Sequence, residues 1–243
     1  EEIKYSYLTK ISKSGEKKWS VIFKENDQIN SILKIKANAS NTYLVGLNDT
    51  DKNSFYILKS ISNTNYEVFK VNSEKPILVS DVQLTDNHLI ISGVIQNKGE
   101  DSYDMFVSKF DKNIGLNNAF KIKSKYEDWL ISCKQIDKNQ MLVFGKTNFN
   151  KKKQVFQYTI NERGNNTLNL FDGFQEVHLF DVTNIQGSFI GAGSAFEKSK
   201  IGVLYNFSSF EKTEEDVFSK ESLNLSVERI DIFKTIDLNS FKN

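Results

Sequence analysis

The sequence predicts an all-β protein built from repeated four-stranded units, and three observations lead to this prediction. Short apolar runs that end in glycine recur at Gly46, Gly93, Gly145 and Gly193, with spacings of 47, 52 and 48 residues. Runs rich in Val, Ile, Phe and Tyr alternate with turn residues, as is typical of strands. Helical periodicity is nearly absent. A chain of 243 residues is long enough to bury a sizeable core in a single all-β domain.

Each repeat contains four strand-like elements, of which the glycine run is the second. The first element is mostly apolar, and the position twelve residues before each glycine is occupied by Lys34, Asp81, Cys133 and Asp181. The third element follows the glycine, in the runs Phe55–Ile61, Met105–Phe110, Val155–Ile160 and Ile201–Phe207. The fourth is short and ends in an aromatic residue, as in Val217-Phe218. Four antiparallel strands per copy form the blade of a β-propeller.

The phase of the repeats predicts a five-bladed β-propeller. Four whole blades are expected at residues 29–71, 77–122, 128–172 and 177–219. The chain opens with a third and a fourth strand at residues 5–23, and it ends with a first and a second strand at residues 223–238. We expect these two halves to pair in one shared blade and close the ring, which leaves no long sheet edge open. A fragment of a longer array and an open stack of sheets are the alternatives.

The charge balance and the hydropathy exclude several classes of protein. Lys and Arg number 32 against 31 Asp and Glu, and this net charge of +1 predicts no nucleic-acid partner. The longest apolar stretch, Leu89–Ile95, is far shorter than the roughly twenty residues that a transmembrane helix needs. The chain opens on Glu1-Glu2-Ile3-Lys4 without a signal segment. Because Cys133 is the only cysteine, no intrachain disulfide is possible.

Three pieces of the repeat carry a resemblance to a known class of protein. They are an apolar strand ending in glycine, a run with a Lys-Xaa-Asp-like end, and a turn that leads to an aromatic residue: Leu44-Val45-Gly46, Val107-Ser108-Lys109-Phe110-Asp111 and Ser14-Gly15-Glu16-Lys17-Lys18-Trp19. The chain resembles the β-propeller repeats of bacterial secreted and cell-envelope proteins. The resemblance implies a propeller outside the cytoplasm, in the periplasm, at the cell surface or secreted, with any signal or anchor segment outside this chain. It implies no particular reaction.

The residue types that usually carry chemistry are scattered. His88 and His178 fall at the starts of strands in different repeats, and neither has a spaced metal-binding partner. Cys133 lies mid-strand among apolar residues, which favours a buried thiol over a nucleophile. Neither a phosphate-binding glycine loop nor a serine nucleophile elbow is present in the sequence. The sequence therefore predicts no metal site and no cofactor.

The first element of each repeat supplies the first group of candidate binding residues. If this element is the innermost strand of a blade, Lys34, Asp81 and Asp181 point into the central channel, with Glu228 as the nearest counterpart in the fifth blade. Such a ring could hold water, a cation or a polar ligand. It could also supply the paired carboxylates of a glycoside hydrolase. Simple polar lining of a wet channel is the favoured explanation.

Two aromatic residues form the second group of candidates. Tyr126 and Trp129 fall beside the connection between the second and third repeats, where they could stack on a sugar or a peptide. A tryptophan that only caps the core explains the pattern equally well. We expect a site on the face formed by the loops into the innermost strands: residues 24–28, 72–76, 123–127, 173–176 and 219–222.

The functional hypothesis is a binding or interaction module of the cell envelope or surface without catalytic activity. Its partner would be a protein or a glycan, bound on the loop face or at the channel mouth. One alternative is a carbohydrate-active enzyme that uses the channel carboxylates, and another is a structural segment of a larger envelope protein. Fold alone does not decide between them, and the sequence predicts no oligomeric state.

Overall fold

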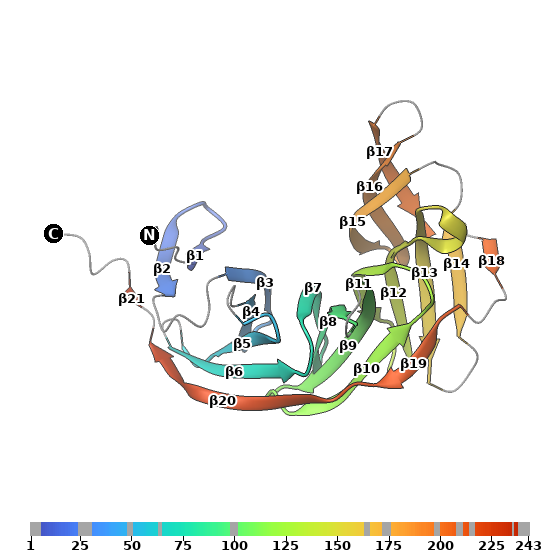
Figure 1. Ribbon diagram of the computed structural model, residues 1–243. Coiled ribbons are helices and arrows are strands. Elements are labelled where there is room, and N and C mark those ends of the chain that lie inside the picture. The colour runs from blue at the N-terminus through green and yellow to red at the C-terminus, as the bar shows by residue number, and fades with distance from the viewer. Residues whose placement is uncertain are drawn as a thin grey trace, which may run out of the picture. The chain divides into compact units, whose positions relative to one another are not determined.

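The computed structural model confirms the all-β prediction. It describes residues 6–23, 31–47, 51–62, 65–97, 102–162, 166–171, 176–196, 200–207, 211–213, 217–234 and 236–237. In these ranges the chain forms antiparallel strands and one short 3-10 turn, η1, at Phe149–Lys151 (Figure 1). The chain divides into two compact units. The first contains Glu1–Ile77, Lys112–Leu116 and Leu225–Asn243, and the second contains Leu78–Asp111 and Asn117–Asn224.

The first compact unit holds two sheets. The N-terminal sheet has the order β1-β2-β21, with bounds Ser6–Ile11, Lys17–Phe23 and Ile236–Asp237. The first-repeat sheet has the order β20-β6-β5-β4-β3, with bounds Leu225–Lys234, Asn65–Ser73, Ser54–Ser60, Thr42–Leu47 and Ser31–Ala37. Leu8 and Trp19 of the N-terminal sheet pack against a buried cluster that includes Leu44, Tyr56 and Leu58. Apolar burial therefore joins the two sheets face to face.

The second compact unit holds three sheets. The second-repeat sheet contains β7 (Ile77–Leu84), β8 (His88–Gln96), β9 (Tyr103–Asp111), β10 (Leu116–Lys123) and β19 (Ser219–Ser222). The third-repeat sheet contains β11 (Asp128–Gln135), β12 (Gln140–Thr147), β13 (Gln154–Asn161), β14 (Thr167–Phe171) and β18 (Glu211–Thr213). The fourth-repeat sheet contains β15 (Glu176–Ile185), β16 (Ser188–Phe196) and β17 (Lys200–Asn206).

These three sheets pack in sequence order through two apolar cores. One core joins Met105 and Val107 of the second-repeat sheet to Val143 and Phe156 of the third-repeat sheet. The other joins Phe144 of the third-repeat sheet to the fourth-repeat sheet, where Phe144 contacts the ring of Phe207 at 4.6 Å between centroids. The third-repeat sheet thus packs one face on the second-repeat sheet and the other on the fourth-repeat sheet.

The recurring glycine lies opposite a bulge in the first strand of its repeat. The register shifts between Ile32 and Lys34 and between Leu179 and Asp181, and the third-repeat sheet shifts at the same place. The bulge brings a main-chain carbonyl against the glycine: a Cβ on Gly93 would lie 2.0 Å from the Leu78 oxygen, and one on Gly193 would lie 2.0 Å from the His178 oxygen. Any side chain would therefore collide with the backbone, which accounts for the repeated glycine.

The C-terminal segment adds one strand to each earlier repeat in reverse order. β18 pairs with β14, β19 with β10, β20 with β6 and β21 with β2, always along the fourth strand of the repeat. Figure 1 shows the long strand β20 running beside β6. The pairing of Val21 with Asp237 and of Ile22 with Ile236 confirms that the two ends of the chain meet in one sheet.

That meeting is narrower than the repeat pattern predicts. We expected all of residues 223–238 to complete the sheet of residues 5–23, but among the described residues of that segment only β21 pairs with it. β20 is one strand with a bulge between Ile230 and Phe233, and it pairs with β6 over most of its length. A ten-residue strand matches the nine-residue edge of β6 better than a tight hairpin.

The fourth repeat also differs from the pattern. Val217-Phe218, expected as its fourth strand, leads instead into β19 on the second-repeat sheet. Phe218 is buried, with its ring 5.2 Å from Phe156 and 4.9 Å from Tyr158. Burial of this aromatic side chain between the second-repeat and third-repeat sheets favours the observed path.

Across the described ranges, no helix is long and apolar enough to cross a membrane.

Candidate functional site

The predicted channel position is held by Ser132, not Cys133, in the third repeat. Ser132 pairs with Phe144, the residue before the glycine, as Asp181 pairs with Ala192 and Lys34 with Val45. Thirteen residues separate Ser132 from Gly145, whereas twelve separate Asp181 from Gly193, so a fixed count reaches the wrong side chain. Cys133 is buried, and this burial raises the pKa of its thiol to about 12, as expected for an unreactive structural thiol.

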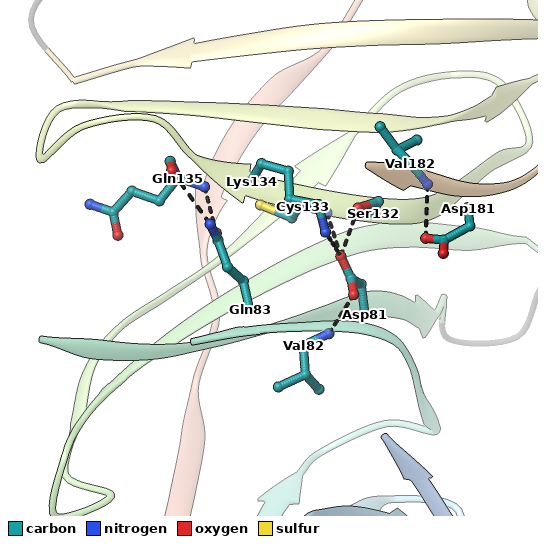
Figure 2. Close-up of polar contacts among 9 residues, drawn as sticks. All are labelled: Asp81, Val82, Gln83, Ser132, Cys133, Lys134, Gln135, Asp181 and Val182. Atoms are coloured by element: carbon teal, nitrogen blue, oxygen red, sulfur yellow. Dashed lines mark hydrogen bonds and ion pairs between the residues drawn. The ribbon is translucent and has the colours of Figure 1, made fainter. Parts of the chain in front are cut away.

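Asp81 links the second-repeat sheet to the third-repeat sheet. Its Oδ2 accepts hydrogen bonds from Ser132 Oγ at 2.7 Å, Lys134 Nζ at 2.8 Å and Cys133 N at 3.3 Å (Figure 2). Its Oδ1 accepts one from Val82 N at 2.8 Å. Burial acts to raise the pKa of Asp81, but the Lys134 charge and these hydrogen bonds outweigh it and hold the pKa below its usual value. A carboxylate with this many partners is suited to joining sheets.

The other predicted channel residues are exposed. Asp181 Oδ1 accepts a hydrogen bond from Val182 N at 2.8 Å, the same local bond that Asp81 makes with Val82. Lys34 is exposed on β3. Glu228 lies on β20, opposite Lys70 of β6. Because β20 is added beside the fourth strand of the first repeat, Glu228 does not lie on the first strand of a repeat, as the channel prediction required. Figure 2 shows Asp81 and Asp181 on separate strands, and the hydrogen bonds of each go to other residues. In the part of the chain that the structure describes, no three His, Cys, Asp or Glu residues are grouped to hold a metal ion.

A cavity of about 290 Å³ opens beside Trp129, and we name it the Trp129 cavity. Its lining comes from β9, the loop before β11, the start of β11, the end of β12, the residues between β12 and β13, and β15: Tyr103, Glu127, Asp128, Trp129, Lys146, Thr147, Asn148, Lys153 and His178. Asn148 N donates a hydrogen bond of 3.0 Å to the Glu127 oxygen, which ties the two loops of the lining together. The cavity adjoins the predicted loop at 123–127. The loop at 24–28 and residues 173–175 lie outside the described residues.

One wall of the Trp129 cavity is aromatic. The rings of Trp129 and Tyr103 meet edge to face, with centroids 5.5 Å apart and an interplanar angle of 63°. Lys146 Nζ lies 5.7 Å from the centre of the Trp129 ring. Tyr126, the other predicted aromatic, packs edge to face on Phe149 at 4.9 Å and lines a separate cavity of about 440 Å³ with Lys123 and Glu221. Trp129, and not Tyr126, therefore belongs to the more aromatic of the two cavities.

Beside Trp129, the cavity is lined by a buried carboxyl group that lacks a full set of partners. Asp128 is 3 % exposed, and its Oδ2 accepts a hydrogen bond from Ser124 Oγ. Thr147, paired with Asp128 across β11 and β12, acts on the Asp128 carboxyl group through its hydroxyl, but Asp128 Oδ1 and Thr147 Oγ1 make no hydrogen bond of good geometry. Burial raises the pKa of Asp128 to about 6; the Ser124 and Thr147 hydroxyls oppose this rise, and the Asp104 carboxylate adds to it. Buried oxygens of this kind favour a polar ligand or ordered water nearby.

Two residues that line the cavity, Lys153 and His178, both contact Glu176. Glu176 Oε1 accepts a hydrogen bond from Lys153 Nζ at 2.6 Å and lies 3.2 Å from His178 Nε2. Lys153 lowers the pKa of Glu176 through this hydrogen bond. The sequence indicated Trp129 and missed Glu176, Lys153 and His178, because they come from β15 and from the residues before β13 and share no motif. Only the adjacency of Asp128 and Trp129 was visible in the sequence.

The chain matches no protein-family model and no curated protein. We therefore infer its function from the geometry of the Trp129 cavity.

Proposed function

We propose that this protein is a non-catalytic binding module of the cell envelope or surface, with its ligand in the Trp129 cavity. The observation that carries the proposal is a partly exposed tryptophan beside Asp128 Oδ1 and Thr147 Oγ1, two buried oxygens that make no hydrogen bond of good geometry. An aromatic ring offers a surface for stacking, and the polar groups beside it fix the orientation of a ligand. A glycan, whose rings combine apolar faces with hydroxyl donors, fits this pairing, as does a peptide with an aromatic side chain.

The expectation of binding without catalysis is supported by how the acidic residues are used. The carboxylate of Asp81 accepts hydrogen bonds from the third-repeat sheet, and Asp128 Oδ2 accepts one from Ser124. A glycoside hydrolase needs two carboxyl groups on opposite sides of the scissile bond. In the Trp129 cavity the second carboxyl group is that of Glu127, the exposed neighbour of Asp128 in sequence.

The rival proposal is a carbohydrate-active enzyme centred on Asp128. The specific observation in its favour is the burial of Asp128, which raises the pKa of this carboxyl group to about 6, a value suited to a general acid. Asp128→Asn separates the two proposals. An enzyme would lose turnover of a glycan and keep its affinity, whereas a binding module has no turnover to lose.

Tryptophan fluorescence tests the binding proposal. Because the chain has two tryptophans, Trp19→Phe leaves Trp129 as the only reporter. We expect a bound oligosaccharide from an envelope glycan panel to change the Trp129 emission, and Trp129→Ala to abolish binding measured by calorimetry. Tyr126→Ala is the matched control, since Tyr126 lines the other cavity and should leave affinity unchanged. Binding that survives Trp129→Ala, or that depends on Tyr126, would contradict the proposal. A full panel without any ligand would favour a structural segment of a larger envelope protein.

We also propose that the five sheets are the blades of a closed β-propeller located outside the cytoplasm. The support is the consecutive antiparallel order of four strands in three repeats and the β2–β21 pairing of the chain ends. Two apolar faces also lack a cover in the described residues: Leu204 on β17 is 76 % exposed, and Tyr7 and Ile11 on β1 are 72 % and 60 % exposed. Closure of the ring would cover both faces.

An engineered disulfide tests this closure. In a Cys133→Ser background, Tyr7→Cys and Leu204→Cys should form a bond within one chain, seen as a faster band on a non-reducing gel. A bond formed only between two chains would contradict the closed ring.

A further inference from the structure

In the described residues, the fourth-repeat sheet ends on β17 (Lys200–Asn206). In each of the other four sheets, a strand from the C-terminal segment covers the corresponding edge. β2, β6, β10 and β14 are the fourth strands of their repeats, and each receives a further strand from the C-terminal segment. The fourth-repeat sheet has the order β15-β16-β17, so β17 is a third strand that ends its sheet in the part of the chain that the structure describes. Its main-chain groups pair with β16 on one side, from Lys200 to Asn206.

The sequence of β17 lacks the features that usually protect an open edge. The strand reads Lys-Ile-Gly-Val-Leu-Tyr-Asn, with one charge, no proline and apolar side chains on both faces. Ile201 is 46 % exposed and Leu204 is 76 % exposed. By contrast, β19 reads Ser-Lys-Glu-Ser and is exposed throughout, a sequence typical of a protected outer strand. Exposed, uncharged and apolar edge strands pair readily with another strand.

We propose that β17 pairs in antiparallel fashion with β17 of a second copy of this chain. A two-fold axis at Val203 would place Ile201 opposite Tyr205 of the partner and join two three-stranded sheets into one of six strands. The strand is suited to pairing with itself, because its apolar centre carries no charge that would face its own copy. The pairing uses the backbone edge and leaves both faces of the sheet available, so it is compatible with a closed ring and independent of the Trp129 cavity.

Light scattering after size-exclusion chromatography tests the proposal on the full chain. We expect the unmodified protein to elute as a dimer. Ile201→Lys places a charge on the edge and should weaken the dimer at least about tenfold. Ile185→Lys is the matched control, because Ile185 lies in the same sheet on β15, is 54 % exposed and should leave the dimer intact. Circular dichroism confirms that both variants remain folded.

Amide hydrogen exchange adds a readout that a lost fold would not mimic. Amides of β17 should gain protection with rising protein concentration in the unmodified protein, and those of β12 should not. A monomer at every concentration would overturn the proposal. So would a dimer that Ile185→Lys breaks and Ile201→Lys does not, because it would place the interface at β15.

Discussion

Asp81 and Asp181 occupy the same position in two sheets of the second compact unit, and they have different surroundings. Both lie twelve residues before the glycine of their repeat, and both accept a hydrogen bond of 2.8 Å from the next backbone N–H. Asp81 is 6 % exposed and also bonds Ser132, Cys133 and Lys134 of the next sheet, whereas Asp181 is exposed. The repeat thus sets the local geometry of the carboxylate. Contact with the following sheet determines whether the carboxylate contributes to stability.

Two apolar residues at matching positions in the same two sheets show the same contrast in burial. Val107 on β9 and Leu204 on β17 both lie in the third strand, opposite the residue that precedes the glycine of β8 or β16. Val107 is fully buried against the third-repeat sheet, while Leu204 is 76 % exposed. Equivalent positions therefore differ in their contribution to stability according to what covers them.

The largest expected effect comes from removing the buried carboxylate. Asp81→Ala leaves Lys134, with a side chain only 17 % exposed, without its counter-charge, and it also removes the partner of the Ser132 hydroxyl. We expect a loss of about 3–5 kcal/mol in the free energy of unfolding. Asp181→Ala, the matched change in the fourth-repeat sheet, should cost less than about 1 kcal/mol. Urea unfolding followed by fluorescence measures both.

Acid should remove the difference between these two variants. The folded-state pKa of Asp81 lies below its value in the unfolded chain, so its stabilisation is present above a pH of about 4 and is lost as pH falls through the folded-state pKa. The cost of Asp81→Ala should therefore shrink in acid. A cost that stays constant down to pH 2 would show that shape, not charge, links the sheets.

The next effect sharpens the comparison of the two apolar positions. Val107→Ala should cost about 2 kcal/mol, because it leaves a cavity between two packed sheets. If the proposed ring closes, Leu204 is covered as well, and Leu204→Ala should cost a similar amount. Thermal unfolding of the two variants measures the ratio. A cost below about 0.5 kcal/mol for Leu204→Ala would show that this face stays open in solution and would argue against closure.

The repeat predicted the strands and their glycines better than it predicted where the last segments pair. The carbonyl beside Gly93 explains why a local pattern recurs, since the collision is set within one hairpin. The third repeat has one more residue between the predicted channel position and its glycine than the fourth repeat has, so the equivalent position is Ser132 and not Cys133. Only the pairing register of β11 with β12 reveals this shift. The path of Phe218 depends on two sheets that the local sequence does not encode. Long-range packing therefore overrides the repeat at its end.

The candidate site shows the same limit in another form. Trp129 was recognisable as an aromatic residue beside a turn, but its setting depends on Tyr103, Lys146 and His178 from three other strands. The neighbouring Asp128 carried no signal, because burial and the absence of a cationic partner are properties of the folded chain. Sequence reasoning found the aromatic residue of the cavity and missed the polar groups that line the cavity with it.

Asp128 is a buried aspartate without the lysine that Asp81 has, and a smaller effect of opposite sign follows. Its folded-state pKa of about 6 lies above the unfolded value of about 4, so the ionised form is disfavoured in the folded protein. Asp128→Asn should therefore raise stability by about 1–2 kcal/mol at pH 8. This gain should fade as pH falls from about 6 to 4, because the native carboxyl group then takes up a proton. An equal gain at pH 4 and pH 8 would assign the effect to hydrogen bonding.

The smallest expected effect divides the Asp81 contact into its parts. Ser132→Ala removes one of the three donors to Asp81 Oδ2 and leaves Lys134 and the Cys133 N–H in place. We expect a loss of about 1–2 kcal/mol, the usual contribution of a hydrogen bond to a charged group. The exposed Ser226→Ala on β20 is the control and should be neutral. In the double variant with Asp81→Ala the Ser132 cost should vanish, because the hydroxyl acts on stability through the carboxylate. A full cost in that background would mean that Ser132 stabilises the third-repeat sheet by itself, and the link between the sheets would then rest on Lys134.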